Sequence, residues 1–353
     1  MEKIVDHKGE NMSLFSKKKI LVTGGTGSLG KELVRHLLMD TDSEIVRIYD
    51  VDETDQFELQ QELKDHGHAC RYFLGDVRDK ERLNRAAEEV DIIFHTAALK
   101  HVMACEYNPF EAIKTNVLGM QNVIDVSINN NVKKIIFTSS DKAVNPSNTM
   151  GATKLLAERL VTSANCYKGP RDCVFSSVRF GNVMGSRGSV IPLFMRQIKY
   201  GGPITITDPT MTRFMMSMSQ AVELVFRSAE MAVGGEVFIF KMPTVNILDL
   251  AEVLIEELAP KYNHNPDDIA IDIIGPKPGE KMYEELMTED EANRSLERDD
   301  MYIILPVIRE GLPDFDESMY DASSVHSNDY ISKFAIPISK KEIKAILLKD
   351  NII

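Results

Sequence analysis

Residues 19–30 read Lys-Ile-Leu-Val-Thr-Gly-Gly-Thr-Gly-Ser-Leu-Gly, an apolar segment that runs directly into a glycine-rich turn. The first five residues predict a short buried strand, and the pattern from Lys31 to Met39 predicts an amphipathic helix behind the turn. Backbone amides at such glycines can approach a pyrophosphate, and the helix directs its positive end at it. A glycine triplet alone is a weak signal, but between a strand and a helix it predicts a dinucleotide site. The expected contacts are Gly24, Thr26, Gly27, Ser28, Leu29 and Gly30.

The alternation of strand and helix patterns continues after this turn. Further buried strands are expected at residues 44–49, 71–74, 91–95, 133–138 and 174–179, with helical patterns between them. Apolar strands that alternate with helices imply a parallel sheet covered on both faces. We therefore predict an α/β protein with a Rossmann-type, doubly wound parallel sheet.

Glycine and proline become frequent after about residue 185, and the order of elements changes. The segments expected there are helices at 219–231 and 247–258, strands at 236–240 and 271–274, and a further helix after the turn at 275–279. They predict a smaller α/β lobe for the substrate, interleaved with the sheet. The dinucleotide-binding domain is predicted over residues 17–185, completed by about 215–243, and the lobe over 186–214 and 244–353. Residues 1–16 read as a loose leader, and the tail around 343–348 reads as a packed helix.

The composition is that of a globular protein. The chain has 353 residues, of which 43% are hydrophobic and 27% are charged, as is usual for a soluble domain. A net charge of −13 disfavours nucleic acid and anionic membrane as partners. The N-terminus is polar, and no apolar run reaches the roughly 18 residues of a membrane span. Four cysteines without metal-type spacing fit a reduced, cytoplasmic protein, and no metal site is expected.

The choice of dinucleotide is read from Asp50, which ends the second predicted strand 20 residues after Gly30. A carboxylate there can accept both ribose hydroxyls of NAD and would repel a 2′-phosphate, and no arginine follows to bind that phosphate. NAD is therefore favoured over NADP. Asp76 and Val77, after the third strand, are expected to flank the adenine, although Asp76 could also cap a helix.

An unusual stretch follows the strand at 133–138. It reads Ser139-Ser140-Asp141-Lys142, and Met150-Gly-Ala-Thr-Lys154 comes after it. In nucleotide-dependent oxidoreductases this place normally holds a Ser and a Tyr-x-x-x-Lys pair. The tyrosine position is occupied here by Met150, and a thioether cannot take a proton from an alcohol. The proton chemistry must therefore lie with other groups, and the adjacent acid and amine are the candidates.

With these motifs together, the chain resembles the extended short-chain dehydrogenases/reductases. Within them it is similar to the nucleotide-sugar 4,6-dehydratases of bacterial polysaccharide and glycan synthesis, which act on UDP-N-acetylglucosamine. The resemblance spans about residues 19–286, and relatives carry either Tyr or Met at the position of Met150. The motifs that carry it are Ala97-Ala-Leu-Lys-His-Val102, Glu106-Tyr-Asn-Pro109, Lys114-Thr-Asn-Val117, Ser140-Asp-Lys-Ala143, Met150-Gly-Ala-Thr-Lys154, Arg179-Phe-Gly-Asn-Val183, Gly185-Ser-Arg-Gly-Ser189, Met211-Thr-Arg-Phe214 and Pro278-Gly-Glu-Lys281.

The resemblance implies an internally redox-neutral reaction on the sugar. The C4 hydride passes to NAD, the resulting ketone acidifies the C5 proton, water leaves across C5–C6, and the hydride returns to C6. Three proton transfers need groups: a base for the 4-hydroxyl, a base for C5 and an acid for the departing 6-hydroxyl.

Lys142 is expected to act as the base at C5, with its pKa lowered by burial and by nearby Lys154. Asp141 is expected to protonate the 6-hydroxyl with a raised pKa, although an adjacent acid and amine can exchange roles. Ser140, or Ser139, would hydrogen-bond O4, and Lys154 would bind the nicotinamide ribose. The 4-hydroxyl proton goes either to Asp141 or through a water or ribose hydroxyl near Lys154, and both routes stay open.

The remaining predicted contacts hold the nucleotide-sugar. Arg187 and Arg213 are expected to clamp its diphosphate, since guanidinium forks match phosphate oxygens. Asn182 would meet the sugar or the first phosphate, and Glu280 would accept the uridine ribose hydroxyls. Lys277 stands where relatives usually have arginine.

By resemblance, the segment after the fourth strand lies at the junction of cofactor and sugar. It contributes Ala97, Ala98, Lys100 and His101, although the histidine could equally brace a loop. Asn116 fits the family's helix-bending asparagine near the cofactor and is expected to be more structural than catalytic.

Two other functions fit the same fold. A UDP-hexose 4-epimerase needs only C4 oxidation and reduction, so it has no use for an acid–base pair aimed at C5 and C6. A non-catalytic dinucleotide-binding sensor is disfavoured by the retained Lys154 and the full set of sugar contacts. The preferred interpretation is that the protein is a lyase that uses NAD and UDP-N-acetylglucosamine and forms a homo-oligomer.

Overall fold

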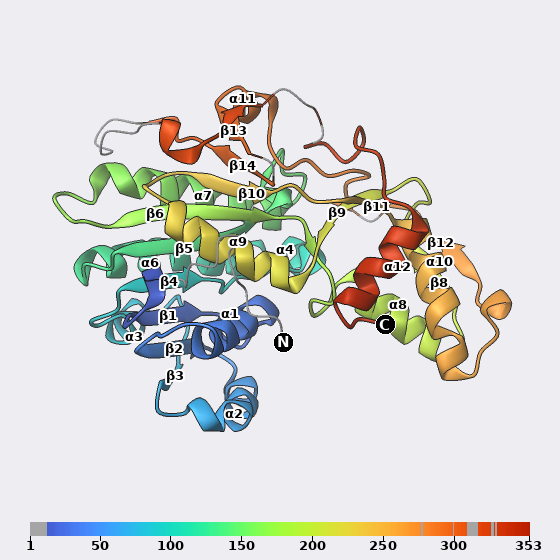
Figure 1. The fold of residues 1–353 in the computed structure, drawn as a ribbon, viewed down its shortest axis with the longest axis horizontal. Helices are drawn as coiled ribbons and strands as arrows, with labels where there is room; N and C mark the ends of the chain where they lie inside the picture. The colour runs from blue at the N-terminus through green and yellow to red at the C-terminus, as the bar shows by residue number, and fades with distance from the viewer. Residues whose placement is uncertain (1–12, 277, 299, 309–316, 326–327, 329) are drawn as a thin grey trace.

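The computed structural model describes residues 13–276, 278–298, 300–308, 317–325, 328 and 330–353. Lys277 therefore lies outside the described residues. The molecule has a large half built around one extended sheet and a smaller lobe beside it, and the C-terminus lies on the lobe (Figure 1).

The large sheet has ten strands in the order β15-β13-β14-β10-β6-β5-β4-β1-β2-β3. Its parallel part runs from β3 to β10, and β14, β13 and β15 extend it with antiparallel pairing. The predicted doubly wound parallel sheet is confirmed, because β2 and β3 are added on one side of β1, and β4, β5 and β6 on the other, as in other Rossmann-type sheets. The strands are β1 Lys19–Thr23, β2 Ile45–Asp50, β3 Cys70–Leu74, β4 Ile92–His95, β5 Lys134–Ser140, β6 Val174–Phe180, β10 Val237–Phe240, β13 Ser295–Glu297, β14 Met301–Ile304 and β15 Ser323–Ser324.

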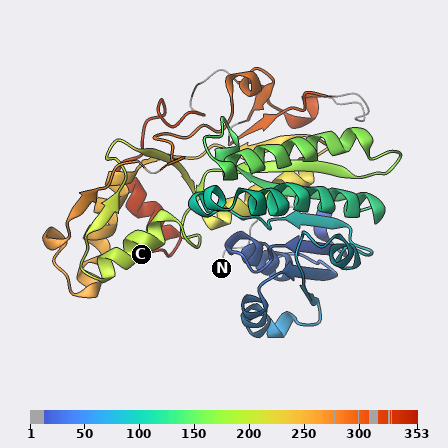
Figure 2. The same ribbon diagram turned by 180° about the vertical axis from the view of Figure 1, so that it is seen from behind.

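Helices cover both faces of this sheet because each presents one apolar stripe to it. On one face, α1 and α9 pack with the strands into a core that includes Leu33, Leu37 and Phe226. On the opposite face, α3, α6 and α7 form a second core, and Figure 2 shows α6 and α7 lying along the sheet. The helices of this half are α1 Ser28–Met39, α2 Glu53–Glu62, α3 Lys80–Ala86, α4 Val102–Tyr107, α5 Pro109–Ala112, a π-helix Ile113–Leu118, α6 Gly119–Asn129, α7 Thr149–Tyr167, α9 Met218–Met231 and α11 Glu289–Ala292.

The lobe has its own apolar core, formed by α8, α10 and α12 with β8 and β12. A three-stranded sheet, β11-β9-β7, connects it to the large half. The predicted C-terminal helix is present and packs there through Ile343 and Leu347. The elements are β7 Asn182–Val183, α8 Val190–Lys199, β8 Ile204–Ile206, β9 Thr212–Met216, β11 Thr244–Asn246, α10 Ile247–Leu258, β12 Ile271–Ile273 and α12 Lys340–Lys349. Short 3₁₀ turns lie at Ser13–Phe15, Lys64–His66, Asp141–Ala143, Pro260–Tyr262, Pro266–Asp268 and Glu317–Tyr320.

Two expectations for the C-terminal part need correction. The helix expected directly after Gly279 is wrong, because residues 280–288 form turns and irregular backbone and only the four-residue α11 follows. Side chains of that segment bond to distant loops, as described below. In addition, β13, β14 and β15 belong to the large sheet, so this part of the 244–353 segment lies with the dinucleotide-binding half; the rest of the division stays a proposal.

Candidate active site

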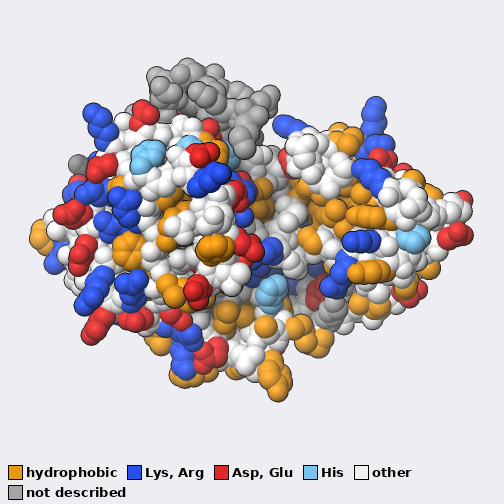
Figure 3. Space-filling model, turned by 90° about the horizontal axis from the view of Figure 1, so that it is seen from below, with side chains coloured by type: hydrophobic (Ala, Val, Ile, Leu, Met, Phe, Trp, Pro, Cys, Tyr) orange, Lys and Arg blue, Asp and Glu red, His pale blue; other side chains and the backbone are white. Residues whose placement is uncertain are grey.

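A cleft of about 880 Å³ lies at the carboxyl ends of β1, β4, β5 and β6, where ligands bind in sheets of this kind. Seen from below, the molecule is hollowed between the large half and the lobe (Figure 3). Most of the predicted site residues line this cleft: Gly24, Thr26, Gly27, Ser28, Leu29, Gly30, Asp50, Asp76, Val77, Ala97, Ala98, Lys100, His101, Ser140, Lys142, Met150, Lys154, Asn182 and Arg187. The cleft lining does not include Asn116, Asp141, Arg213 or Glu280.

The glycine-rich turn is built to hold an anion. Helix α1 begins at Ser28, and its N-cap residue Gly27 makes no side-chain cap, so the first amides of the helix keep no side-chain partner. The turn also packs very closely, since a Cβ atom at Gly30 would lie 2.2 Å from the carbonyl oxygen of Gly24. A larger residue at position 30 would separate the helix from the turn. These features fit a dinucleotide pyrophosphate.

Asp50 connects the turn to the end of β2. Its Oδ2 accepts bonds from the backbone amide and hydroxyl of Thr26 at 3.0 and 2.7 Å. Its Oδ1 accepts from the amides of Val51 and Asp52. A ribose hydroxyl that binds Asp50 would have to replace the Thr26 hydroxyl as a donor to its carboxylate. A ribose contact for Asp50 therefore stays a proposal.

Asp76 lies in the cleft but caps no helix. Its carboxylate binds the side chain and amide of Arg78, while Asp79 is the N-cap of α3. The capping alternative for Asp76 is therefore wrong. Burial opposes the charge of this carboxylate, but the bonds from Arg78 outweigh it and lower the pKa of Asp76.

Asn116 has a structural position behind the cleft, and its predicted contribution to cofactor binding stays a proposal. It is buried in the π-helix, and its amide bonds the backbone N and O of Leu99 at 2.8 and 3.0 Å. The same amide donates to the Thr153 hydroxyl at 2.9 Å. Asn116 thus joins the loop after β4 to α7 and supports the cleft wall from behind.

Helix α7 brings Met150 and Lys154 to the cleft. Asn148 caps its first turn by accepting a bond from the Gly151 amide. A Cβ atom at Gly151 would lie 2.1 Å from the carbonyl oxygen of Lys142, so a glycine is needed where the helix meets the loop after β5. Met150 is buried and packs against Cys105 and neighbouring apolar side chains.

Lys154 is held at the floor of the cleft. Its Nζ donates to the carbonyl oxygen of Thr138 at 2.9 Å and lies 4.8 Å from the centre of the Phe137 ring. Burial lowers the pKa of Lys154 to about 8, and the nearby Glu158 only partly opposes this. Near neutral pH a fraction of the Lys154 side chains is therefore neutral.

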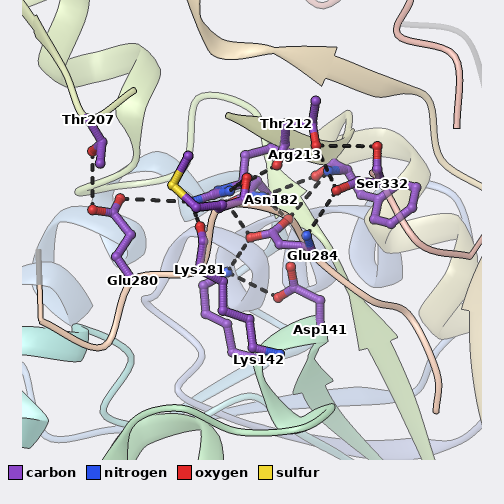
Figure 4. A network of polar contacts seen from close by, with 12 residues as sticks. Asp141, Lys142, Asn182, Thr207, Thr212, Arg213, Glu280, Lys281, Glu284 and Ser332 are labelled. Carbon is purple, nitrogen blue, oxygen red and sulfur yellow. Dashed lines mark hydrogen bonds and ion pairs between the residues drawn. The ribbon is translucent and has the colours of Figure 1, made fainter. Parts of the chain in front are cut away.

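Lys142 lies between two buried carboxylates. Its Nζ is 3.1 Å from Oδ1 of Asp141 and 3.0 Å from Oε1 of Glu284 (Figure 4). Lys142 reaches the cleft with 30% of its side chain exposed, whereas the Asp141 side chain is fully buried behind it. The Ser140 hydroxyl donates to the same Asp141 oxygen at 2.7 Å.

The electrostatics of this group correct both predicted pKa directions. Burial alone would lower the pKa of Lys142, but Asp141 and Glu284 outweigh it and raise that pKa. Burial would likewise raise the pKa of Asp141, but the adjacent ammonium lowers it. The raised carboxyl pKa belongs to Glu284 instead, where burial and then the charge of Asp141 move it to about 7.

The structure does not bring the two predicted diphosphate arginines together. Arg187 extends over the cofactor turn, where its guanidinium binds the Thr26 carbonyl at 2.9 Å and pairs with Asp55 at 2.5 Å. Arg213 lies in the lobe beside Glu284 at 3.3 Å and Glu280 at 3.8 Å. Arg187 thus lies against the glycine-rich turn, and the two arginines do not form a joint clamp in this structure.

Lys100 and His101 both meet the loop that carries Arg187. The ammonium of Lys100 donates to the Arg187 carbonyl at 2.7 Å, and burial with the nearby guanidinium lowers the pKa of Lys100. A Cβ atom at Gly188 would lie 2.5 Å from the His101 ring. The two side chains therefore brace the loop over the cleft while still lining it.

The polysaccharide biosynthesis protein family matches residues 20–306 of the sequence. The chain belongs to this family. It is 55% identical over 335 residues, covering 95% of its length and 96% of the other's, to an uncharacterized membrane protein of Methanocaldococcus jannaschii. It is 45% identical over 297 residues to an inverting UDP-N-acetylglucosamine 4,6-dehydratase of Campylobacter jejuni, covering 84% and 85% of the two chains. A UDP-glucose 4-epimerase of Rickettsia prowazekii is 38% identical over 342 residues, covering 95% and 96%.

Among solved structures, Pen from Bacillus thuringiensis is similar, with a TM-score of 0.89 and 46% identity, covering 96% of this chain and 99% of Pen. The family inferred from the motifs is thereby confirmed, and its curated relatives include both dehydratases and epimerases. In the described part of this family member, no helix is long and apolar enough to cross a membrane. The same residues contain no cluster of His, Cys, Asp or Glu suited to a metal ion.

The sequence reasoning missed Glu284. The residue follows the family motif Pro278-Gly-Glu-Lys281 in a stretch that was expected to be helical, and in a helix Glu280 and Glu284 would lie on the same face. The structure instead turns Glu284 inward with 4% exposure, against a lysine 142 residues earlier. Its spacing from Glu280 offers no signal for that contact.

Proposed function

We propose that the protein is an NAD-dependent UDP-N-acetylglucosamine 4,6-dehydratase, a hydro-lyase of surface glycan or polysaccharide biosynthesis. One observation carries the proposal. The ammonium of Lys142 faces the cleft, two buried carboxyl groups stand behind it, and Met150 occupies the tyrosine position. A lysine backed by two carboxyl groups can serve the proton transfers at C5 and C6, which a 4-epimerase does not perform.

The glycine-rich turn and the start of α1 would hold the pyrophosphate of NAD, with Asp50 and Asp76 on the adenosine side. When bound, the dinucleotide supplies the redox chemistry, accepting the C4 hydride and returning it at C6. Lys154 would bind the nicotinamide ribose from the floor of the cleft. Arg187, over the turn, is proposed to retain the cofactor rather than the sugar.

The side chains after β5 supply the proton transfers. Ser140 hydrogen-bonds the C4 oxygen, and the 4-hydroxyl proton leaves through Lys154, whose lowered pKa supports this route over Asp141. The amine of Lys142 takes the C5 proton after its own proton has moved to the carboxyl groups behind it. The C6–O6 bond then breaks as Lys142 returns a proton to the leaving hydroxyl, and water departs. Asp141 acts through Lys142, because its side chain does not reach the cleft.

The nucleotide part of the substrate is assigned to the lobe side. Asn182 and Arg213 are proposed to meet the sugar and diphosphate, and Glu280 the uridine ribose. In the free structure, Asn182 donates to Glu284 at 2.8 Å and Glu280 accepts from Thr207 at 3.1 Å. These groups are therefore already ordered before the substrate arrives.

The test is incubation of the protein and NAD with UDP-N-acetylglucosamine in deuterium oxide, followed by NMR. The expected product is a UDP-4-keto-6-deoxy-N-acetylhexosamine with deuterium at C5. An unchanged substrate under conditions where NAD binds would contradict the proposal.

A second candidate is a UDP-hexose 4-epimerase, favoured by the 38% identity to the Rickettsia prowazekii enzyme over nearly the whole chain. The same incubation separates it, since an epimerase would give UDP-N-acetylgalactosamine with the 6-hydroxyl retained. UDP-glucose, run in parallel, identifies an epimerase that acts on the sugar without the acetamide.

A further inference from the structure

Glu284 is a buried ionisable group at the junction of lobe and sheet. Five groups from four other segments contact it: Lys142 at 3.0 Å, Arg213 at 3.3 Å, Asn182 at 2.8 Å, the Phe214 amide at 3.3 Å and, through its own backbone amide, the Ser332 hydroxyl at 2.9 Å. Figure 4 shows its carboxylate at the centre of this network. The Asp141 carboxyl group faces it across the Lys142 ammonium.

The segment that carries Glu284 is docked on the loop after β5 through residues shortly before Glu284. Asn148 and Ser147 donate to the Gly279 carbonyl at 2.9 and 3.1 Å. The Lys281 ammonium donates to the Val144 carbonyl at 2.8 Å. The loop that holds the catalytic lysine and the lobe segment that holds Glu284 therefore form one unit.

One atom in this unit lacks a partner. Oδ2 of Asp141 is buried and receives no hydrogen bond when both carboxyl groups are ionised, an arrangement that is costly in a protein interior. A proton on Glu284 supplies the missing donor, and such a bond lowers the pKa of Asp141 while raising that of Glu284. The charged groups around the pair are Lys142 and Arg213, and Glu280, Lys281 and Glu285 lie on the same segment as Glu284.

We infer that Glu284 and Asp141 form a carboxyl pair that stores the proton which Lys142 must release before it can act as a base. This inference rests on the proposed dehydration and deepens it. One proton passes from the ammonium to the pair, the neutral amine then takes the C5 proton and gives a proton to O6, and the stored proton returns through Lys142 when C5 is reprotonated. The 4-hydroxyl proton that left through Lys154 passes by way of water to Lys142 and restores its ammonium, so protons balance over the cycle and no further reactant is needed. Glu284 acts through Lys142 and is a positioning residue.

The test compares E284Q with wild type and with E285Q. Glu285 is the matched control, because it lies on the same segment but binds Asn145 and Lys281 instead of the catalytic group. We expect E284Q to lower kcat at neutral pH at least about 10-fold, to leave KM within about threefold, and to lose a titration of kcat near neutral pH that wild type and E285Q keep.

Wild-type kcat in E284Q, or a uniform loss that keeps the neutral titration, would overturn the inference. A rise of KM alone would do the same, since it would assign Glu284 to substrate binding. Where E284Q does not fold, E284D replaces it, because the shortened carboxyl group no longer reaches Asp141 and the same loss of titration is expected.

A measurement without substrate separates this inference from the proposed function. The stability of the wild-type protein relative to E284Q should fall between about pH 5 and about pH 8 if Glu284 holds a proton in the folded state. That result, with no dehydration of UDP-N-acetylglucosamine by wild type, would reject the proposed function and keep the carboxyl pair. A pH-independent difference would reject the pair whatever the reaction is.

Discussion

The Nζ atom of Lys142 lies 3.0 Å from Oε1 of Glu284, although 142 residues separate them in the sequence. This contact joins the end of β5 in the large sheet to the loop before α11. Asp141 raises the pKa of Lys142 most, and Glu284 as a second carboxylate raises it further, so the ammonium stays charged in the free protein. The base expected at C5 must therefore be generated within the site during the reaction.

Replacing Lys142 by alanine should abolish dehydration while NAD still binds. The side chain faces the cleft, but the glycine-rich turn that would hold the dinucleotide is built from other segments. The expected loss in kcat is about 10³-fold, in the range of general acid–base catalysis. Product formation by NMR and NAD binding by calorimetry measure the two effects. Lys133→Ala is the control, since Lys133 is exposed and pairs with the exposed Asp172; normal turnover in the Lys142 variant would reject its role.

Replacing Met150 by leucine should leave activity within about tenfold of wild type, because the swap nearly conserves volume in an apolar contact. Met150 is 3% exposed and packs against Cys105 and Ala112. Steady-state kinetics of Met150→Leu provide the measurement. A fall below about a thousandth of wild type, beyond any packing cost of this swap, would show that the sulfur has a direct part in the reaction.

We expect kcat of the wild type to rise through about pH 8 and the Lys154→Arg variant to lose this rise. Burial lowers the pKa of Lys154 to about 8, so its neutral form, which can accept the 4-hydroxyl proton, becomes abundant above that pH. An arginine keeps the positive charge at every accessible pH. The pH profiles of kcat of the two proteins are compared. An unchanged profile in the arginine variant would instead support Asp141 as the group that accepts the 4-hydroxyl proton.

Replacing Arg179 by methionine should destabilise the protein by about 3–5 kcal/mol. Arg179 is fully buried, pairs with Glu158 at 2.7 Å and Glu291 at 3.0 Å, and donates to the Leu286 carbonyl. Its removal leaves two buried carboxylates without their main partner. Urea unfolding measures the change in the free energy of unfolding. The control is Arg227→Met, which breaks the partly exposed pair with Asp300. It should lower the free energy of unfolding by under about 1 kcal/mol. Equal costs in the two variants would contradict the assignment.

The stability of wild type relative to Glu284→Gln should fall as pH rises. The pKa of Glu284 is raised from 4.5 to about 7 in the folded protein, so its contribution is complete below about pH 4.5 and is lost as pH rises through about 7. The loss amounts to at most roughly 3 kcal/mol. The lowered pKa of Asp141 changes the stability of the protein only below about pH 4, which lies outside this pH range. Denaturant unfolding of both proteins at about pH 5 and about pH 8 checks the sign.

Much of the dinucleotide half followed from local sequence. The strand before Gly24, the turn and the helix after it are each specified by neighbouring residues, and the predicted strands agree with β1 to β6 within a few residues. The segment after Gly279 was misread because its side chains bond across the molecule. Glu284 and Lys281 meet the loop after β5, and these contacts hold irregular backbone where local preference favours a helix.

The sequence alone determined which chemical groups are present. These are a phosphate-binding turn, an acid and an amine after β5, a lysine one helical turn beyond Met150, and a thioether instead of a phenol at position 150. Only the tertiary structure decided the protonation of these groups. A pKa depends on burial and on charges within a few ångströms, and at Lys142 the adjacent Asp141 raises the pKa most while Glu284, 142 residues away in the sequence, raises it further. The tertiary structure also separates Arg187 and Arg213, both suited to phosphate: Arg187 lies over the glycine-rich turn, whereas Arg213 lies beside Glu284, outside the cleft lining.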